Sequence, residues 1–381
     1  MRERFPGIGL EWARFDGPAG TQMVDTAIDA MAEFLRSGDN ANGHGYFAAS
    51  TASTELVDDA RATVARLLGA DAEGIVFGAN MTTLTFAITR ALARQWEPGD
   101  EIVGTRLDHD ANVTPWQLAA DDRDARLVLA PFDPETGRLD PKAVIERIGP
   151  RTKWVTITGA SNALGTMPDL AAVIAAAHSA GARVFVDGVH LVPHARVDLQ
   201  ALGCDIFVTS PYKWYGPHSG VVWIAPDLRE TLVPYKVRPA SNSAPERFET
   251  GTVSFEAIAG IRAAAAFLLE AGIAEIAAVE RARFGPLLRG LQDLPHVTVY
   301  GPPDLVDRTP TVSWTVTGQE PDAVATHLAQ RHVAVWSGNY YAVETMAALG
   351  LRTGAVRAGV SGYTSEADVT RLLDAVGELD R

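Results

Sequence analysis

The sequence predicts an α/β fold in which helices cover a mostly parallel β-sheet. Two observations predict it. Short apolar runs alternate with longer segments of helical periodicity up to about residue 255, which is the order that βαβ units produce. The short runs are also apolar throughout, as in strands that helices bury on both faces. The chain has 381 residues, 47% of them hydrophobic, which is enough for a large domain and a smaller one.

The α/β domain is expected over residues 21–255, with strands and helices in regular alternation. The strands are predicted at residues 74–80, 101–108, 152–161, 182–190, 204–210 and 220–226. The helices between them are predicted at residues 54–70, 82–96, 141–149 and 169–181. The last of these helices ends on Gly181, a residue type that favours helix C-termini.

Two further parts complete the expected organisation. Residues 1–20 are expected to form an N-terminal segment that packs across the domains, and residues 256–381 a smaller α+β domain. This smaller domain begins with a long Ala-rich helical region, followed by short strands and helices. Its final helix is predicted to start near Ser365, because Asp368 three residues later gives a capping-box-like beginning.

The composition argues against several classes of partner and site. The formal net charge is −14, so the surface repels nucleic acid and anionic lipid. Cys204 is the only cysteine, which excludes a disulfide within the chain and fits a cytoplasmic location. The N-terminus lacks an apolar signal region, and charged residues interrupt the apolar stretch 260–279, so no membrane span is expected. No metal site is expected, because His190 and His194 flank Pro193 outside any HExxH pattern.

Polar side chains follow the predicted strands at the points where the strands end. In open α/β sheets, ligands bind outside the carboxyl ends of the strands. We therefore expect one edge of the sheet to gather Thr82, His109, Asn162, Asp187, His190, Ser210, Tyr212 and Lys213. Taken alone, Lys213 could be a solvated loop lysine, Asp187 a turn residue and His109 an exposed histidine.

Three of these features together predict pyridoxal 5′-phosphate as the cofactor. The segment GANMTT, residues 78–83, places small residues and a hydroxyl at a helix start, where backbone N–H groups bind phosphate. It lacks the GxGxxG and GxxxxGK patterns of dinucleotide and P-loop sites. Asp187 could pair with a protonated pyridine nitrogen, and Lys213 with a lowered pKa could form a Schiff base.

Several motifs give the chain a family resemblance over nearly its whole length. The most specific are LDHDANVTPW, GASNALGT, VDGVH, SPYKWYGPH, RFETGT and AVRAGV. With them the chain resembles the class V aminotransferase superfamily of fold-type I pyridoxal phosphate enzymes, and within it the cysteine desulfurase-like branch. The resemblance implies a seven-stranded-type, mostly parallel sheet domain with a smaller C-terminal α+β domain.

The resemblance implies roles for the residues around the cofactor ring. Lys213 would bind the cofactor as a Schiff base and move the proton at the substrate Cα. His109 would stack on the pyridine ring, and Asp187 would keep the ring nitrogen protonated. Asn162 and His190 would lie near the phenolic oxygen, where desulfurases usually have Gln in place of His190.

The resemblance also implies a phosphate site and a homodimer with shared active sites. The phosphate ligands on this chain would be Met81 through its backbone, Thr82, Ser210 and Tyr212, which replaces the usual His. Gly251 and Thr252 would reach the phosphate of the partner subunit. His44 would also enter the neighbouring active site.

The substrate implied by the resemblance is a small-molecule amino acid, whose identity the sequence does not specify. Arg357 would bind its carboxylate through a bidentate pair. Asn339 and Tyr341, in the loop VAVWSGNYYA at residues 333–342, are further substrate-binding candidates. Its other aromatic residues, Trp336 and Tyr340, could line the pocket or pack in the core. Cysteine desulfurases carry a persulfide-forming Cys in this loop, and Tyr341 stands at that position. A phenol cannot accept a sulfane sulfur, so the covalent persulfide step is not expected.

These residues favour C–S bond cleavage by β-elimination as the leading hypothesis. Elimination requires a base at Cα, an electron sink and a carboxylate-binding group, which Lys213, Asp187 and Arg357 would support. Transamination, epimerisation like that of isopenicillin N epimerase, and decarboxylation are the alternative reactions. A non-catalytic accessory protein is disfavoured by the intact Lys213, and a nicotinamide-dependent dehydrogenase by the missing glycine fingerprint.

Overall fold

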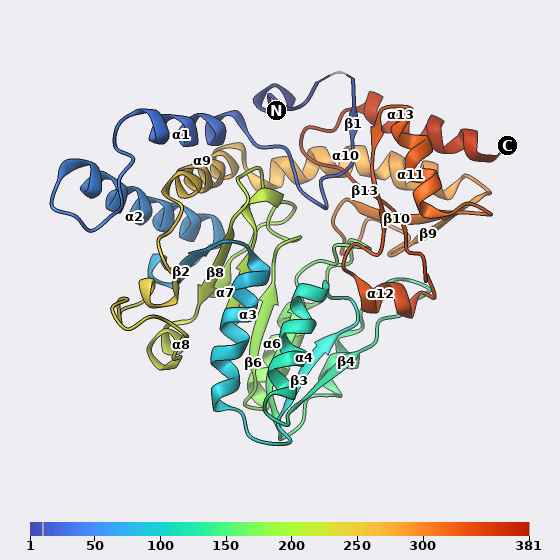
Figure 1. The fold of residues 1–381 in the computed structure, drawn as a ribbon. Helices are drawn as coiled ribbons and strands as arrows, with labels where there is room; N and C mark the ends of the chain where they lie inside the picture. The colour runs from blue at the N-terminus through green and yellow to red at the C-terminus, as the bar shows by residue number, and fades with distance from the viewer. Residues whose placement is uncertain (10, 381) are drawn as a thin grey trace.

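A seven-stranded β-sheet forms the centre of the larger part of the molecule (Figure 1). The computed structural model describes residues 1–9 and 11–380. The strand order is β2-β8-β7-β6-β5-β3-β4, and only β8 is antiparallel to its neighbours, so the predicted mostly parallel sheet is confirmed. The strands are β2 (Ile75–Gly78), β3 (Glu101–Thr105), β4 (Arg126–Ala130), β5 (Thr152–Thr158), β6 (Arg183–Asp187), β7 (Ile206–Thr209) and β8 (Gly220–Ile224).

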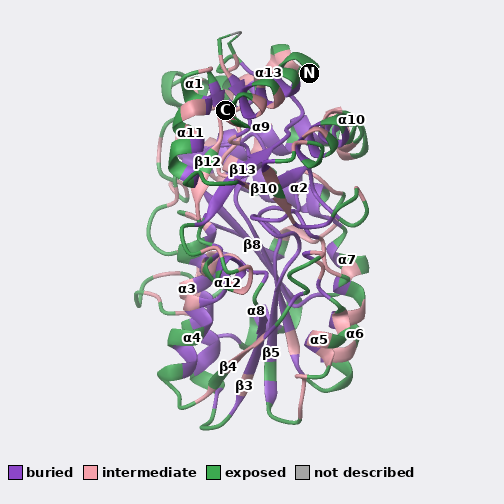
Figure 2. Cartoon of the chain, turned by 90° about the vertical axis from the view of Figure 1, so that its right-hand side faces the viewer, coloured by how far each residue is buried: buried purple, intermediate pink, exposed green. Residues whose placement is uncertain are grey.

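Helices cover both faces of this sheet (Figure 2). One face carries α3 (Met81–Leu92) and α4 (Thr114–Asp121); the other carries α5 (Pro141–Ile145), α6 (Leu170–Ser179) and α7 (Leu199–Leu202). Successive residues of β6 point to opposite faces. Val184 and Val186 belong to the core that includes α6, whereas Phe185 belongs to the core that includes α3 and α4. This double burial explains why consecutive residues in the middle of β6 are all apolar.

Three further helices pack together beside the sheet: α1 (Asp25–Arg36), α2 (Ala48–Leu68) and α9 (Phe255–Ala271). A short helix, α8 (Pro226–Thr231), follows β8. Gly272 ends α9 with a φ of +79°, a conformation that favours glycine. The Ala-rich region expected as one helical stretch is therefore two helices, α9 and α10 (Ile273–Gln292). Because α9 packs against α1 and α2, the domain boundary at residue 255 stays a prediction.

None of the helices in residues 1–9 and 11–380 is by itself long and apolar enough to cross a membrane. Only α9 and α10 taken together meet that test, by length and composition, and they are bent by 77° relative to each other.

A four-stranded antiparallel sheet lies in the C-terminal part, in the order β12-β13-β10-β9. Its strands are β9 (Val297–Tyr300), β10 (Thr311–Val316), β12 (Trp336–Gly338) and β13 (Ala355–Gly359), and α10, α11 (Pro321–Ala329) and α13 (Glu366–Gly377) contribute to its core. The helix α12 (Val343–Ala348) connects β12 to β13. The predicted capping box is confirmed: Ser365 Oγ accepts from Asp368 N at 3.2 Å, and Asp368 Oδ2 accepts from Ser365 N at 2.8 Å.

The N-terminal segment contacts both parts of the chain. Its strand β1 (Ala13–Arg14) pairs in parallel with β11 (Val333–Ala334). Upstream, the ring of Phe5 packs edge-on against Tyr215 at 4.9 Å and against Tyr363 at 5.0 Å. The segment thereby links the end of the central sheet to the C-terminal part (Figure 1).

Candidate active site

A cavity of about 990 Å³ lies at the carboxyl ends of the central strands and is closed on its other side by the β12–β13 region. A small inner space adjoins it and shares His109, Asn162 and Lys213 as lining residues. Most of the predicted site residues line these two spaces: Met81, Thr82, His109, Asn162, Asp187, His190, Tyr212, Lys213, Asn339, Tyr341 and Arg357. The structure therefore brings together residues that the sequence places at the ends of separate strands.

Lys213 ends the short 3₁₀ turn Pro211–Lys213 that follows β7, and it is only 6% exposed. Burial lowers the pKa of its amine, and the positive charge of Arg357 lowers it further. The carboxylate of Asp187 acts in the opposite direction. The net direction is downward, which favours a neutral amine that can act as a nucleophile or base.

Asp187 is the last residue of β6 and is buried. Its Oδ1 accepts a hydrogen bond from the backbone N–H of Val189 at 2.9 Å. Burial raises the pKa of this carboxyl, and the hydrogen bond and the charge of Lys213 oppose that rise. A buried carboxylate of this kind is stabilised by a cation placed against it.

The start of α3 presents unpaired backbone donors to the cavity. Asn80 caps this helix, with its Oδ1 accepting from Thr83 N at 2.8 Å. The backbone N–H groups of Met81 and Thr82, in the first turn, have no partner within the helix, and such groups bind phosphate. Tyr212 lies across the cavity, stacked on His218 with ring centroids 5.2 Å apart.

The ring of His109 is fixed at both its edge and its face. Its Nδ1 accepts from Ala111 N at 3.0 Å, so a neutral ring carries its proton on Nε2. The ring of Tyr341 stacks on it with centroids 5.5 Å apart. Burial lowers the pKa of His109 to about 3, and Lys213 and Arg357 act in the same direction. The imidazole is therefore neutral at physiological pH.

A buried polar network includes the neighbours of His109 in the chain, and the sequence reasoning did not single out its members. Asp108, 1% exposed, accepts from Asn112 Nδ2 at 2.7 Å and from the hydroxyl of Thr105. Asn112 Oδ1 in turn accepts from Thr156 Oγ1 at 2.7 Å and Trp116 Nε1 at 3.1 Å. Burial raises the pKa of Asp108 to about 8. The spacing of Asp108 and Asn112 in DHDAN was the available signal for this network.

Arg357, Asn162 and Tyr340 form a closed ring of contacts. Arg357 Nη1 donates to Asn162 O at 2.8 Å, and Asn162 Nδ2 donates to Tyr340 O at 2.9 Å. The guanidinium of Arg357 lies 4.3 Å from the ring centroid of Tyr340, and the Tyr340 hydroxyl donates to Ala355 O. Tyr340 is expected from the sequence either to line the pocket or to pack in the core. It is buried and also lines the cavity, so both expectations describe it.

The loop that carries Tyr340 and Tyr341 is held in an uncommon conformation. The two residues have φ values of +54° and +58°, which cost energy for non-glycine residues and often mark functional sites. The backbone N–H of Asp110 donates to Tyr341 O at 2.7 Å, and Asn339 Oδ1 accepts from Tyr341 N at 3.0 Å. These bonds fix the loop against the cavity.

His190 is buried at the inner end of the site. Its Nε2 lies 2.8 Å from Thr311 Oγ1, and its ring packs edge-on against His194 at 5.3 Å. Burial lowers its pKa, and the neighbouring His194, Lys213, Arg357 and His109 lower it further. His190 is therefore a neutral hydrogen-bonding group at this position.

Four predicted residues do not line the cavity. Ser210 is fully buried directly after β7. The other three, His44, Gly251 and Thr252, are exposed. They lie in loops that do not line the cavity of their own chain. Their expected contacts with a partner subunit stay a prediction.

The residues of the site fit pyridoxal phosphate. Two buried polar atoms of residues that line the cavity, Asn162 Oδ1 and Arg357 Nε, have no hydrogen-bond partner. Such groups are costly to bury unless a ligand bonds to them. The set offers an amine at Lys213, a carboxylate at Asp187 and a helix start at Met81, which match an aldehyde, a pyridine nitrogen and a phosphate.

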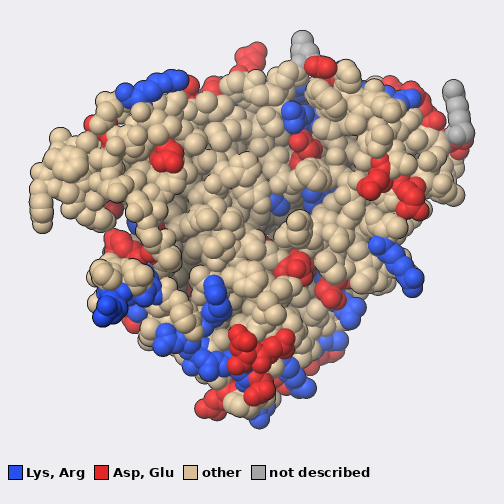
Figure 3. Space-filling view, viewed as in Figure 1, with Lys and Arg blue, Asp and Glu red and all other residues tan. Residues whose placement is uncertain are grey.

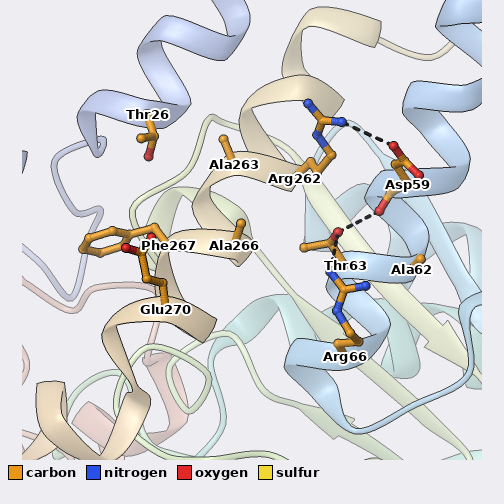
Figure 4. Close-up of a pocket in the computed structure, with 10 residues that line it drawn as sticks. All are labelled: Thr26, Asp59, Ala62, Thr63, Arg66, Arg262, Ala263, Ala266, Phe267 and Glu270. Carbon is orange, nitrogen blue, oxygen red and sulfur yellow. Dashed lines mark hydrogen bonds and ion pairs between the residues drawn. The ribbon is translucent and has the colours of Figure 1, made fainter.

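Two other features of the chain lie outside this site. Cys204, the single cysteine, is buried before β7, and burial raises the pKa of its thiol. A separate pocket of about 470 Å³ lies between α1, α2 and α9 (Figure 4). Arg262 Nη1 lies 3.5 Å from Asp59 Oδ2 in this pocket, and none of the predicted site residues line it. No group of three or more potential metal ligands occurs among residues 1–9 and 11–380.

The ring formed by Arg357, Asn162 and Tyr340 predicts the effect of changing Tyr340. Tyr340→Leu removes the aromatic face under the guanidinium and should weaken carboxylate binding about five- to thirtyfold, because buried cation–π contacts contribute about 1–2 kcal/mol. Tyr340→Phe keeps the face and should lose less. The measurement is the Kd of an amino acid and of the matched amine that lacks the carboxylate. Equal weakening of both ligands by Tyr340→Leu would contradict this role.

The lowered pKa of His109 predicts a pH dependence of stability. An unfolded histidine binds a proton below about pH 6.5, whereas folded His109 does so only near pH 3. The unfolded state therefore binds more protons between these values, and stability is lost as pH falls from about 6.5. His109→Asn should reduce this loss by up to about 1.4 kcal/mol per pH unit in urea unfolding of the apoenzyme. A slope that His109→Asn leaves unchanged would contradict this assignment.

Comparisons with known proteins show the family to which the chain belongs. The aminotransferase class-V family model matches residues 14–372. A probable cysteine desulfurase of Pseudomonas putida is 33% identical over 99% of this chain and 97% of its own length. A cysteine desulfurase of Klebsiella pneumoniae is 32% identical, covering 98% of this chain and 96% of its own.

Two solved structures resemble the whole chain. The cysteine desulfurase CsdA from Escherichia coli has a TM-score of 0.91 at 28% identity, over 99% of this chain and 97% of its own. The apo cysteine desulfurase from Thermococcus onnurineus NA1 has a TM-score of 0.93 at 28% identity, and the match covers 99% of this chain and 96% of that one. The predicted family, fold type and cofactor are confirmed. The chain therefore belongs to the class V aminotransferase family of pyridoxal phosphate-dependent enzymes, in its cysteine desulfurase-like branch.

Proposed function

We propose that this protein cleaves the C–S bond of cysteine or a cysteine conjugate by β-elimination. The observation that carries the proposal is a buried, low-pKa Lys213 in the same cavity as Arg357, with no thiol lining that cavity. The relatives named cysteine desulfurase support C–S chemistry. Tyr341 stands where cysteine desulfurases carry the persulfide-forming Cys, and Cys204 does not line the cavity. We therefore expect the sulfur product to be released without covalent capture by this chain.

Binding would orient the amino acid through its carboxylate. Arg357 has a buried Nε without a partner, and it can form a charge-assisted, bidentate pair with a carboxylate. Because Asn162 and Tyr340 hold the guanidinium in place, the carboxylate position is fixed relative to Lys213. Fixed orientation of the reacting group is a large part of catalysis.

Proton transfer at Cα would fall to Lys213. Pyridoxal phosphate, when bound, supplies an electron sink for the negative charge that develops at Cα. The lowered pKa of Lys213 lets its amine take the Cα proton near neutral pH. Asp187 would hold a proton at the pyridine nitrogen, and neutral His109 would stack on the ring without adding charge.

The elimination balances without an oxidant or reductant. A proton leaves Cα, the Cβ–S bond breaks, and the sulfur departs as a thiolate that takes up a proton. The remaining three-carbon fragment reacts with water to give pyruvate and ammonium. Net, one cysteine conjugate and one water yield a thiol, pyruvate and ammonium.

The first test is replacement of the lysine. Lys213→Ala should lose both the yellow colour of the holoenzyme and the cofactor adduct that borohydride fixes, and should lower pyruvate formation by at least about a thousandfold. Lys153→Ala, at a half-exposed lysine, is the matched control and should behave like wild type. Absorbance, mass spectrometry and coupled pyruvate assays give the three readouts.

The products distinguish the alternatives. Sulfide or thiol formed with pyruvate supports elimination. A stable pyridoxamine form would indicate transamination instead. Exchange of the Cα hydrogen without net product would indicate epimerisation, and loss of carbon dioxide would indicate decarboxylation. A wild-type protein that is colourless and takes up no added cofactor would indicate an accessory role.

We propose in addition that the enzyme is a homodimer with shared active sites. The loop before α2 exposes Tyr46 and Phe47, and the loop after α8 exposes Tyr235 and Val237. Both loops lie on the left side of Figure 1, and Figure 3 shows few charged side chains over α1 and α2 on that side. Exposed apolar groups that cluster in this way favour a protein interface. Thr252, outside its own cavity, is then available to the partner.

Mixed dimers test this arrangement. Lys213→Ala and Thr252→Asp protomers should each be nearly inactive, because the second places a negative charge at the phosphate. Refolded together at equal amounts, they should regain about a quarter of wild-type activity, since half of the dimers are mixed and each has one intact site. Light scattering should give a dimer mass. A monomer, or no regained activity in confirmed mixed dimers, would contradict shared sites.

A cytoplasmic setting is also part of the proposal, because the single thiol of the chain cannot form an internal disulfide.

A further inference from the structure

The outer rim of the active-site cavity carries an arginine that has no partner among the described residues. Arg352 is exposed, lies in the turn before β13 and lines the cavity. It makes no hydrogen bond or ion pair with any part of the chain that the structure describes. Arg106, by contrast, lies outside the cavity and is 3.8 Å from Glu344. The position of Arg352 leaves its guanidinium free for a ligand in the cavity.

A second donor lies on the same rim. Asn339 also lines the cavity, and its Oδ1 is occupied by the N–H of Tyr341 at 3.0 Å, which leaves its amide nitrogen as a donor. The rim is compact because a Cβ on Gly354 would lie 2.1 Å from the carbonyl oxygen of Gly338. Residues 338–339 and 352–354 are therefore close neighbours, and they present donors to the cavity.

Among the described residues, one carboxylate lines the larger cavity and accepts from a neighbouring threonine, while Asp187 lines the inner space. Asp110 accepts from Thr114 Oγ1 with both oxygens, at 3.0 and 2.9 Å. Two guanidinium groups, by contrast, line the same cavity, those of Arg357 and Arg352. Two guanidinium groups on one cavity favour a ligand with two negative groups.

The cavity has to hold both the cofactor and the amino acid, and aromatic side chains line it. Its volume is about 990 Å³, at the upper end for small-molecule sites. Trp336, which is 52% exposed, Tyr341, which is 70% exposed, and Phe86 line it. Arg352 and Arg357 are five residues apart, so their Cα atoms are separated by at most about 18 Å. This upper limit and the shared cavity allow one extended amino acid to contact both residues.

We propose that the substrates are cysteine S-conjugates whose sulfur substituent has a planar apolar part and ends in a carboxylate bound by Arg352 and Asn339. The proposal rests on the proposed C–S lyase function. Arg357 holds the α-carboxylate, the aromatic residues contact the substituent, and Arg352 binds the distal carboxylate. The bond that breaks is the Cβ–S bond, and the substituent leaves as a carboxylated thiol after protonation of the sulfur.

The test uses two pairs of probes on the holoenzyme. The substrates are S-benzylcysteine and S-(4-carboxybenzyl)cysteine, compared by kcat/KM for pyruvate release. The binding probes are their analogues in which a methylene replaces sulfur, so that no thiol can be lost, compared by Kd. Wild type should favour the carboxylated member of each pair by about tenfold, the effect of a charge-assisted pair at a partly open site.

Matched variants assign the preference to Arg352. Arg352→Gln should remove the tenfold preference and leave the uncarboxylated probe unchanged, which also shows that the variant is folded. Arg106→Gln should keep the preference. Equal binding of both probes by wild type, or a preference that survives Arg352→Gln, would overturn the proposal. An intact binding preference without pyruvate release would instead count against the C–S lyase function alone.

Discussion

The buried amine of Lys213 is the constraint on which the rest of the site depends. Removing an ammonium group from water is costly unless it is paired, and here Arg357 adds to that cost while Asp187 reduces it. The amine is held beside Asp187 because β6 and β7 are neighbours, with Asp187 paired to Val208 in their register. The strand order of the central sheet therefore sets how far Asp187 offsets the lowering of the Lys213 pKa by burial. Burial, Lys213 and Arg357 keep His109 neutral, and the hydrogen bond from Ala111 N fixes its ring.

The sequence was informative where function depends on local order. Lys213, Asp187 and Asn162 each follow an apolar strand, and parallel strands place their carboxyl ends on one edge, so their meeting could be predicted. The start of α3 was visible as small residues before a helical pattern. Gly272 divides the Ala-rich region because its positive φ ends α9, and composition alone does not distinguish such a break from a continuous helix.

The remaining contacts depend on residues far apart in the chain. Asn162 and Tyr340 are 178 positions apart, and Asn162 and Arg357 are 195 apart, so no local pattern reveals their ring of contacts. The left-handed conformation of Tyr340 is equally hidden, because bulky residues rarely adopt it. Arg352 could not be distinguished from an ordinary exposed arginine until the cavity was known. The placement of His44, Gly251 and Thr252 depends on a second subunit and remains a prediction.

The division of the site between two sheets has a thermodynamic consequence. Lys213 follows a strand of the central sheet, whereas Arg357 lies within β13 of the C-terminal sheet. A ligand that touches both residues links the two sheets in the folded state and cannot do so once they separate. Ligand binding must therefore raise the free energy needed to part them, by an amount that grows with ligand concentration relative to its Kd. The ligand-binding equilibrium therefore determines both how much of the site is occupied and how strongly the two sheets are held together.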